Sequence, residues 1–477
     1  MLVDRWHELV VPTDLTAFQS GGSWLVTNPA LAGWLRVDDD EYRTLGRLVA
    51  ARASGGAPAA LTFGVSDSAA RLRLEKTLAR FVLNWIVYLP EHVPEIPAPA
   101  PQLRTTYYAI TEGCNLRCPY CYAAALGPRA NELSTAEAID LIDQVADMGA
   151  QEFIFTGGEP TLRFDLFQVA ARSRERGMRT NIITNGTRVK TAAFARRVAE
   201  HFDIVTVSVD GGSAAVHERT RGRGTFRVLE RALALLNQAG VQPKINHVVG
   251  ANNVAHLDET MTFLGRYQTR EVRVLNHAPL GRGLEDGQDL DWENYLQVHT
   301  FACGPGARRL IADGPRLPKP CSIRGNCGLG GTEIYVNSVG DVYPCKLLTN
   351  PAQRAGNLRD AALSELFQAP VLAGLRATSV RSFAGCETCY VRGVCGGGCR
   401  AYHAGYSGDL TINSERFCRT LRHMTISQLW IASGLDPAAL RDRNASAYAP
   451  VRVGHPVVEP RVPDLPTIDP QDAALWS

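Results

Sequence analysis

The sequence predicts an α/β protein built around a parallel sheet, and three observations lead to that prediction. From residue 103 to about residue 279, short apolar runs alternate with amphipathic stretches of helical period, which is the pattern of strands joined by crossover helices. A cysteine-free stretch, residues 1–93, precedes this region and has strand and helix patterns of its own. Eight of the twelve cysteines lie between Cys321 and Cys418, which predicts a third region rich in metal-ligating thiols.

Composition excludes several classes of protein. The 477 residues include 50 Lys and Arg against 48 Asp and Glu, and a net charge of +2 gives no reason to expect nucleic acid as a partner. No run reaches the roughly 18 apolar residues of a membrane span, and the segment after Met1 lacks the apolar core of a signal peptide. We therefore expect a cytoplasmic protein without a membrane partner, in which clustered cysteines bind metal rather than form disulfides.

Residues 1–93 are predicted to form a winged-helix-like α+β domain, because three short strands precede two helices. The predicted strands are residues 6–11, 23–27 and 33–37, and the predicted helices are residues 40–50 and 69–88. The expected apolar faces are Tyr42, Leu45, Leu48 and Val49 in the first helix and Leu72, Leu74, Leu78, Phe81 and Leu83 in the second. Alternating prolines then predict an extended linker over residues 94–102.

Residues 103–300 are predicted to form the central α/β domain. Its six predicted strands are residues 106–110, 152–155, 180–184, 204–209, 241–248 and 272–275. A capping box from Ser134 to Glu137 predicts a helix start, and the leucine-rich segment 227–239 predicts another amphipathic helix. Ligands of such sheets bind at the carboxyl ends of the strands, so we expect the active site there.

Three cysteines stand in one loop after the first of these strands, at Cys114, Cys118 and Cys121. Iron–sulfur clusters are usually held by four cysteine thiolates, so a set of three leaves one iron open to bind a small molecule. A structural zinc site, which usually has four ligands, and three unrelated buried thiols are the alternatives. The residues further along the chain favour the cluster.

The spacing Cys114-x3-Cys118-x2-Cys121, with Tyr120 before the last cysteine, resembles the signature of the radical S-adenosylmethionine (SAM) superfamily. This resemblance implies a partial (β/α)6 TIM-like barrel, which agrees with the six predicted strands. It also implies that SAM fills the open iron, with Tyr120 in the SAM site, and that the reduced cluster splits SAM into methionine and a 5′-deoxyadenosyl radical. The cofactor supplies the difficult chemistry and the protein positions it.

Three further segments resemble the SAM contacts of this family. The motif Gly157-Gly158-Glu159-Pro160 follows the second predicted strand and resembles the segment that contacts the SAM amino group. Ser208, at the end of the fourth predicted strand, corresponds by resemblance to a ribose or carboxylate contact. Arg221 resembles the arginine that binds the SAM carboxylate as a planar fork, and solvation at the surface is the alternative interpretation.

The later cysteines resemble the SPASM extension of radical SAM enzymes. The resemblance assigns a first auxiliary cluster to Cys321, Cys327, Cys345 and Cys399, and a second to Cys386, Cys389, Cys395 and Cys418. With the SAM cluster this implies three [4Fe–4S] clusters, of which the auxiliary pair is fully ligated by protein and therefore suited to electron transfer. Two four-cysteine zinc sites fit the same number of thiols. Cys303 is left over, either as a buried small side chain or as a catalytic residue.

One position departs from the family's pattern. Sulfatase maturases carry an aspartate base directly after the third of these cysteines, whereas this chain has Lys346 there. The departure argues against oxidation of a serine or cysteine of the sulfatase type. Lys346, Tyr390, Tyr402 and His403 are candidates for substrate chemistry near the clusters, with solvated polar residues as the alternative, and the catalytic base stays unassigned.

Residues 1–93 also resemble the precursor-recognition domain of many peptide-modifying enzymes, which is related to the small chaperone of pyrroloquinoline quinone biosynthesis. This resemblance rests on pattern and position, and a helical cap on the barrel is the alternative. It implies that the leader segment of a precursor peptide adds a strand to a sheet edge. We expect the SPASM domain over residues 301–425, followed by a C-terminal helix and tail over residues 426–477.

Together the resemblances imply a radical SAM peptide maturase that oxidatively modifies a ribosomally made precursor, for example by a thioether or carbon–carbon crosslink. An external electron donor of flavodoxin or ferredoxin type would reduce the SAM cluster, and an auxiliary cluster would accept the electron released from the substrate. One alternative keeps this chemistry and replaces the peptide with a whole protein or a small molecule such as an alcohol. The other is a multicluster electron carrier or zinc scaffold without catalysis.

Overall fold

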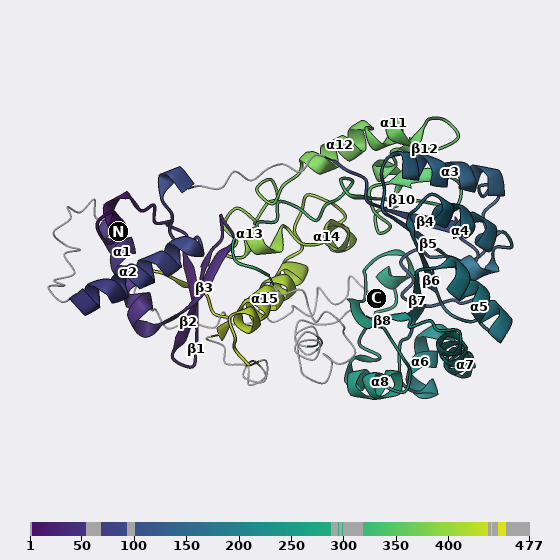
Figure 1. Ribbon diagram of the computed structural model, residues 1–477, viewed down its shortest axis with the longest axis horizontal. Helices are drawn as coiled ribbons and strands as arrows, with labels where there is room; N and C mark the ends of the chain where they lie inside the picture. The colour runs from purple at the N-terminus through teal and green to yellow at the C-terminus, as the bar shows by residue number, and fades with distance from the viewer. Residues whose placement is uncertain are drawn as a thin grey trace, which may run out of the picture. The chain divides into compact units, whose positions relative to one another are not determined.

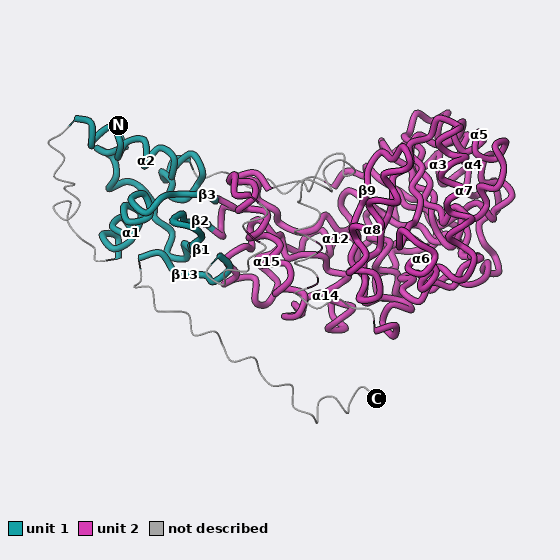
Figure 2. Tube along the Cα trace, turned by 90° about the horizontal axis from the view of Figure 1, so that it is seen from below, with its two compact units in different colours: residues 1–28, 34–92, 443–477 teal, residues 29–33, 93–442 magenta. Residues whose placement is uncertain are grey.

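The structure is a computed structural model of the 477-residue chain, and it describes residues 2–53, 68–92, 101–287, 294, 298, 318–436, 440 and 447–454. The chain divides into two compact units, coloured separately in Figure 2: residues 1–28, 34–92 and 443–477 form the first, and residues 29–33 and 93–442 form the second. Cys303, most of the predicted linker and the predicted boundary at residue 300 lie outside the described residues. Within the described residues, no helix is both long enough and apolar enough to cross a bilayer.

The first unit is a small sheet with two long helices. Its described elements are η1 (Trp6–Glu8), β1 (Thr16–Ser20), β2 (Ser23–Asn28), β3 (Gly33–Asp38), α1 (Asp39–Ala53), α2 (Ser68–Leu83), η3 (Pro90–His92) and β13 (Val451–Arg452). The strand order is β13-β1-β2-β3, with β1 antiparallel to both of its neighbours. A short strand from the C-terminal region, which the sequence analysis assigned to a tail, therefore occupies the β1 edge. In the part of the chain that the structure describes, no strand pairs with the outer edge of β3.

The first predicted strand, residues 6–11, is wrong. Residues 6–8 form the 3-10 helix η1, in which the backbone N–H of Glu8 donates to the carbonyl oxygen of Arg5 at 2.9 Å, and the Arg5 Nε donates to the Glu8 carboxylate at 2.9 Å. Val10 makes a single bridge to Tyr88. The sequence analysis missed β1, whose Ala, Gln and Ser residues have little strand propensity, because pairing with β2 determines its conformation.

The apolar face of α2 is narrower than predicted, whereas all four predicted apolar residues of α1 pack in the core of this unit. Leu45 and Leu48 of α1, and Leu74, Leu78 and Phe81 of α2, are buried in one core. Leu72 and Leu83 are 55% and 76% exposed. Residues 74, 78 and 81 follow the spacing of one helical face, and positions 72 and 83 fall outside it.

The second unit contains a nine-stranded sheet of order β12-β11-β10-β4-β5-β6-β7-β8-β9. The strands are β4 (Thr105–Thr111), β5 (Glu152–Gly157), β6 (Arg179–Thr184), β7 (Ile204–Ser208), β8 (Lys244–Val249), β9 (Glu271–Asn276), β10 (Glu333–Val336), β11 (Asp341–Tyr343) and β12 (Gly356–Asn357). Strands β4 to β9 are parallel neighbours, and each overlaps a predicted strand. Beside β4 the sheet continues with β10, parallel to it, and then with the antiparallel β11 and β12.

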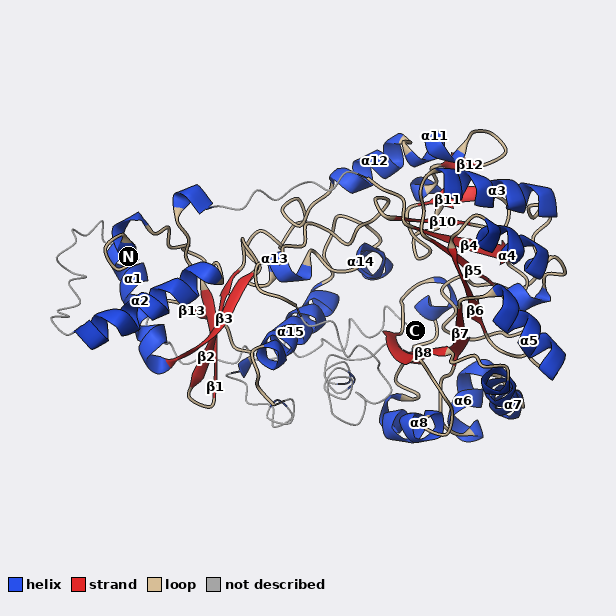
Figure 3. Cartoon of the chain, in the orientation of Figure 1, coloured by secondary structure: helices blue, strands red, loops and turns tan. Residues whose placement is uncertain are grey.

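Helices α3, α4, α5 and α7 lie along one side of this sheet (Figures 1 and 3). The barrel helices are α3 (Thr135–Asp147), α4 (Leu166–Glu175), α5 (Ala192–His201), α6 (Ala214–Arg221), α7 (Thr225–Gln238) and α8 (Leu257–Leu264), with short turns η4 (Pro160–Leu162), η5 (Val254–His256) and η6 (Gly281–Leu284). The later elements are η7 (Pro351–Gln353), α11 (Leu363–Phe367), α12 (Pro370–Ala377), α13 (Arg392–Cys395), α14 (Arg400–Ser407) and α15 (Glu415–Ala432). The predicted capping box at Ser134 and Glu137 is confirmed, because both of its hydrogen bonds are present.

Apolar residues from the strands and these helices form one continuous core. It includes Phe155 of β5, Leu141 of α3, Val169 of α4, Val198 of α5 and Leu233 of α7, all fully or almost fully buried. The sheet is therefore rigid along its length, and the loops at the carboxyl ends of its strands are held in fixed positions.

Candidate active site

The cluster loop, residues 112–126, begins where β4 ends, as the sequence predicts. Backbone hydrogen bonds close it: the N–H of Cys114 donates to the carbonyl oxygen of Leu126, and the N–H of Cys121 to that of Cys118, both at 3.2 Å. Cys118 is buried, and Cys114 and Cys121 are half-buried. The three predicted thiols thus stand in one ordered loop at the carboxyl end of the first barrel strand.

The state of the thiols agrees with ligation. The cysteines in the described part of the chain are free of disulfides. Burial raises the pKa of the Cys114 and Cys118 thiols, so each thiol would release its proton to solvent on becoming a thiolate ligand. Among the described residues, no three His, Cys, Asp or Glu side chains already stand close enough to hold one metal ion.

An arginine that the sequence analysis missed fastens the cluster loop. Arg282, in η6 after the last barrel strand, donates from Nε to the carbonyl oxygen of Cys118 at 3.0 Å and from Nη1 to that of Ala125 at 3.1 Å. Its own backbone N–H donates to the carbonyl oxygen of Cys121 at 3.1 Å. The preceding Gly281 has φ +56°, and a Cβ there would lie 2.3 Å from the carbonyl oxygen of Tyr122. The Gly-Arg-Gly run at 281–283 was the available signal.

The glycine pair at the end of β5 lies against the cluster loop. A Cβ on Gly157 would stand 2.1 Å from the carbonyl oxygen of Thr111, and one on Gly158 would stand 2.2 Å from that of Gly113. The N–H of Gly158 donates to Thr111 and that of Glu159 to Gly113, both at 2.8 Å. The absence of a side chain at these two positions thus allows the end of β5 to approach closely the loop that holds the cysteines.

The carboxylate of Glu159 is fully buried and already well supplied with donors. Its Oε1 accepts from the hydroxyl groups of Thr161 at 2.5 Å and Thr184 at 2.6 Å, and its Oε2 accepts from the backbone N–H of Asn185 at 2.7 Å. Burial raises its pKa. Glu159 therefore ties the ends of β5 and β6 together. Pro160, the last residue of the motif, follows Glu159 and begins η4.

The loop after β6 completes this side of the site. Asn185 donates from Nδ2 to the Oδ1 of Asn115 at 3.0 Å, and Asn115 donates to the hydroxyl of Thr187 at 2.8 Å. Asn115 lies inside the cysteine motif, so these side chains connect the cluster loop to the third barrel strand.

On the other side, Asp210 lies at the centre of a buried network. Its carboxylate accepts from the Tyr120 hydroxyl at 2.5 Å, from the Thr220 hydroxyl at 2.8 Å and from Arg221 Nε at 2.6 Å. Arg221 Nη2 adds a longer contact of 3.3 Å. Tyr120 belongs to the cysteine motif and Arg221 ends α6, so one carboxylate joins two of the predicted SAM contacts. Asp210 itself was not among the predicted site residues.

The charges in this network are well defined. Burial by itself raises the pKa of Asp210, but the charge and hydrogen bonds of Arg221 outweigh it and hold the pKa at about 2. The Arg221 side chain is 10% exposed, which excludes the surface interpretation of this residue. Ser208 lies two residues before Asp210 and is half-buried at the carboxyl end of β7. Tyr120, Ser208 and Arg221 therefore share one end of the barrel with the cysteines.

The four cysteines assigned to the second auxiliary cluster line one small cavity. Cys386, Cys389, Cys395 and Cys418 all border it, together with His403 and Arg422. Burial, and then the neighbouring Cys389, Cys386 and Cys418, raise the pKa of the Cys395 thiol to about 12. These residues come from a loop, from α13 and from α15, so the fold brings together a ligand set that is dispersed over 33 positions of the sequence.

The fold brings together only part of the cysteine set assigned to the first auxiliary cluster. Burial, then Glu333 and then the nearby Cys399 raise the pKa of the Cys345 thiol, and burial and Cys327 raise that of the Cys399 thiol. Cys345 lies two residues after β11, and Cys399 directly precedes α14. Cys321 has a left-handed backbone with φ +63°, and burial raises the pKa of its thiol to about 11.

Lys346, at the position where sulfatase maturases have an aspartate, lies against an aromatic residue of the first barrel strand. Its Nζ lies 3.9 Å from the centre of the Tyr107 ring on β4. Burial by itself lowers the pKa of Lys346, but Tyr107, Tyr122 and Glu333 together hold it above its usual value. A permanently charged ammonium cannot act as the base that the aspartate provides.

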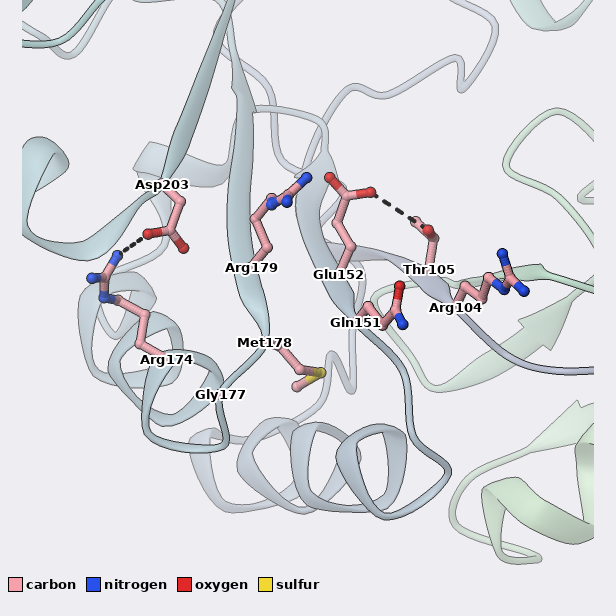
Figure 4. Close-up of a pocket in the computed structure, with 9 residues that line it drawn as sticks. All are labelled: Arg104, Thr105, Gln151, Glu152, Arg174, Gly177, Met178, Arg179 and Asp203. Atoms are coloured by element: carbon pink, nitrogen blue, oxygen red, sulfur yellow. Dashed lines mark hydrogen bonds and ion pairs between the residues drawn. The ribbon is translucent and has the colours of Figure 1, made fainter.

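A larger pocket opens at the opposite end of the barrel (Figure 4). It is bordered by Thr105, Glu152 and Arg179, the first residues of β4, β5 and β6, and by the ion pair of Arg174 Nη1 with Asp203 Oδ1 at 2.7 Å. Because the cysteines and predicted SAM contacts are at the carboxyl ends of the strands, this pocket is remote from the chemistry.

Comparison with known proteins agrees with this geometry. Residues 108–264 match the family model of the radical SAM superfamily, and residues 327–390 match that of the SPASM iron–sulfur cluster-binding domain. Mycofactocin maturase MftC of Mycolicibacterium smegmatis is 31% identical over 305 residues, which cover 62% of this chain and 77% of that protein. The chain belongs to the radical SAM superfamily. It is a radical SAM enzyme that binds SAM and iron–sulfur clusters and carries a SPASM domain.

The radical SAM enzyme is also similar to a second curated protein and to a solved structure. The AdoMet-dependent heme synthase of Methanosarcina barkeri is 29% identical over 350 residues, covering 66% of this chain and 96% of that protein. The structure of SuiB from Streptococcus suis bound to S-adenosylmethionine has the same fold, with a TM-score of 0.55 at 16% identity, over 85% of this chain and 99% of that chain. SuiB has also been solved with its precursor peptide SuiA.

Proposed function

We propose that this radical SAM enzyme is a peptide maturase that oxidatively crosslinks a ribosomally made precursor, through a thioether or carbon–carbon bond. The observation that supports a peptide substrate is the first unit, whose sheet has one edge occupied by β13 and one edge, β3, without a partner among the described residues. MftC is named as a maturase, and SuiB binds a precursor peptide.

Residues of the chain have distinct roles in this proposal. Cys114, Cys118 and Cys121 hold the SAM cluster, and the backbone of Gly157 to Pro160 orients the SAM amino group. Ser208 contacts the ribose or carboxylate. When bound to the reduced cluster, SAM supplies a 5′-deoxyadenosyl radical that abstracts hydrogen from the substrate.

Arg221 is positioned to hold an anionic group. Its Nε and Nη2 donate to Asp210, and its Nη1 makes no hydrogen bond to any described residue. The guanidinium fork therefore retains a donor for the SAM carboxylate. Asp210 fixes the orientation of that fork, and the Tyr120 hydroxyl fixes Asp210 in turn.

The proposal includes three [4Fe–4S] clusters, with the two auxiliary ligand sets as predicted. The grouping of Cys386, Cys389, Cys395 and Cys418 around one cavity supports the second set. Full ligation by protein suits the auxiliary clusters to accept the electron that substrate oxidation releases. An external donor of flavodoxin or ferredoxin type reduces the SAM cluster, and we place the reaction in the cytoplasm.

The leader segment of the precursor would bind the β3 edge as an added strand. Backbone amides that gain a strand partner become protected from hydrogen exchange. On addition of leader peptide to the full-length enzyme, we expect slower exchange in residues 33–38 and no change in residues 16–20 of β1. The matched control is a peptide that contains the core segment without the leader.

The reaction itself is tested with the peptides encoded by any short open reading frames next to the gene. The reconstituted enzyme, dithionite and SAM should produce 5′-deoxyadenosine and a peptide lighter by two hydrogens. Unchanged peptide mass with full SAM cleavage, together with no protection of β3, would overturn the peptide assignment.

A second candidate is a small-molecule substrate, which is favoured by the match that covers 96% of the AdoMet-dependent heme synthase. In that case SAM cleavage would be stimulated by the small molecule and remain unaffected by peptides. Exchange in residues 33–38 separates the two candidates, because a small molecule in the barrel leaves the β3 edge unpaired.

A further inference from the structure

Arg400 is a buried cation in the SPASM domain that the reaction described above does not use. It follows Cys399 directly at the start of α14 and is 2% exposed. Its guanidinium donates from Nε to the carbonyl oxygen of Leu410 at 2.7 Å, and from Nη1 to that of Gly397 at 3.1 Å and to the Asn413 Oδ1 at 2.7 Å. The Phe383 ring lies 3.9 Å from Cζ. These contacts fix the position of the charge.

The partners of Arg400 are neutral. Among the described residues no carboxylate lies within ion-pair distance, and the hydrogen-bond acceptors are carbonyl and amide oxygens. Asp409 feels the charge of Arg400, but it is exposed and accepts from the backbone N–H of Thr411 at 2.6 Å. Burying a charge without an opposite charge nearby is strongly unfavourable. A negative group must therefore compensate this arginine.

The candidates for that negative group are cysteines of both auxiliary sets. Burial lowers the pKa of Arg400, and negative charge on Cys386 and Cys418 of the second set and on Cys327 and Cys399 of the first raises it, because all four thiols lie near its guanidinium. A direct chain of contacts leads to the second set, because Asn413, which accepts from Arg400, donates from Nδ2 to the Cys386 sulfur at 3.1 Å. Arg400 is thus placed between the two groups of thiols, and its position follows from the turn that also presents Cys399.

We propose that Arg400 is a positioning residue shared by the two auxiliary clusters. The fixed positive charge of Arg400 raises the reduction potential of both clusters. This inference rests on the proposed ligand sets. A cluster held by four thiolates is negatively charged and gains a further negative charge on reduction, so a nearby buried cation stabilises the reduced form more than the oxidised form. The shared charge thus helps both clusters to accept an electron from the oxidised substrate.

The test is a redox titration of the reconstituted full-length protein, followed by electron paramagnetic resonance, on a Cys118→Ala background that simplifies the spectrum. Arg400→Gln removes the charge and keeps polar contacts. At a fixed potential we expect the reduced-to-oxidised ratio of both auxiliary clusters to fall about tenfold, equivalent to about 59 mV for a one-electron couple. Arg381→Gln, at an exposed position in the same domain, is the matched control and should leave both potentials unchanged.

Two further variants separate charge from structure. Arg400→Lys keeps the charge but loses the fork, so both potentials should stay near those of the wild type, whereas a purely structural role predicts damage equal to that of Arg400→Gln. Asn413→Ala removes the donor to Cys386 as well as one acceptor of Arg400, and it should lower the potential of the second cluster more than that of the first.

The outcomes are distinct. Iron counts are measured for every variant, and if Arg400→Gln loses its clusters, full iron and wild-type potentials in Arg400→Lys support the proposal, and cluster loss in both overturns it. Two auxiliary signals with unchanged potentials in Arg400→Gln also overturn it. A wild-type protein without two auxiliary signals would instead overturn the proposed cluster sets.

Discussion

The guanidinium of Arg282 donates to the carbonyl oxygen of Cys118 at 3.0 Å, which joins the end of the last barrel strand to the loop that follows the first. The two residues are separated by 164 positions in the sequence. Arg282 also contacts Ala125, on the other side of Cys121. One side chain that follows the last barrel strand thus holds the cluster loop at two points, Cys118 and Ala125.

Arg282→Ala should therefore loosen the cluster loop. The variant loses two hydrogen bonds from a charged donor, each contributing about 1.5–3 kcal/mol. We expect it to incorporate less iron into the SAM cluster while the auxiliary clusters remain. Iron analysis with electron paramagnetic resonance measures this. Arg273→Ala, on the exposed face of β9, is the control, and equal cluster content in both variants would show that Arg282 is dispensable.

Gly158→Ala should displace the cluster loop by steric conflict. Its Cβ would stand 2.2 Å from the carbonyl oxygen of Gly113, which is backbone and cannot rotate away. SAM binding, measured anaerobically by calorimetry, should weaken at least about tenfold, or about 1.4 kcal/mol. Gly374→Ala in α12 meets no atom within 4 Å and should bind SAM normally. Normal SAM affinity in Gly158→Ala would contradict the packing described for the β5 end.

Asp210→Asn should destabilise the fold more than an ordinary surface change. It leaves the Arg221 guanidinium buried without its counter-charge, which costs about 3–5 kcal/mol in comparable pairs. The matched control is Asp203→Asn, whose ion pair with Arg174 is about 40% exposed and should contribute less than about 1 kcal/mol. Urea unfolding of the metal-free protein under reducing conditions compares the two. Similar losses in the free energy of unfolding in both variants would mean that Asp210 does not balance the buried charge of Arg221 as described.

The stability should also depend on pH through His217. Burial lowers its pKa to about 4, and its Nδ1 accepts from the backbone N–H of Asp210 at 3.2 Å. Between about pH 6.5 and pH 4 the unfolded chain binds a proton that the folded protein does not, so the free energy of unfolding falls as the pH falls, by roughly 3 kcal/mol for this residue.

His217→Gln should flatten that dependence between pH 4 and 6.5, in urea titrations of the metal-free protein. His201→Gln, at a partly exposed position at the end of α5, is the control and should follow the wild type. Identical slopes for His217→Gln and the wild type would contradict the role given to this imidazole.

The parallel sheet could be predicted because buried parallel strands are continuous apolar runs. Each of the six predicted barrel strands overlaps an observed one, and the cysteine loop lies at the predicted strand end. The strands β10 to β12 were not predicted, because they have two to four residues each and are stabilised by pairing with β4 and with one another. Similarly, β1 depends on its partner β2, and its own sequence has little strand signal.

Residues of the site that belong to sequence motifs could be predicted. Residues that reach the site only through the tertiary fold could not. The sequence indicated Glu159 and Arg221 but not their partners, since Thr184 and Asp210 become neighbours only through sheet register and helix placement. The same holds for three residues that contact or adjoin the cysteines: Arg282, Asn413 and Arg400. An arginine or asparagine outside a motif gives no signal for such a contact in a single sequence.

The measurement that tests the central claim most directly is anaerobic reconstitution followed by iron and sulfide analysis and an assay of dithionite-driven SAM cleavage, with Cys118→Ala as control. We expect about twelve irons per chain, the sum for three cubane clusters, and 5′-deoxyadenosine formation that disappears in Cys118→Ala. Zinc in place of iron, or full clusters without SAM cleavage, would contradict a radical SAM reaction at this site.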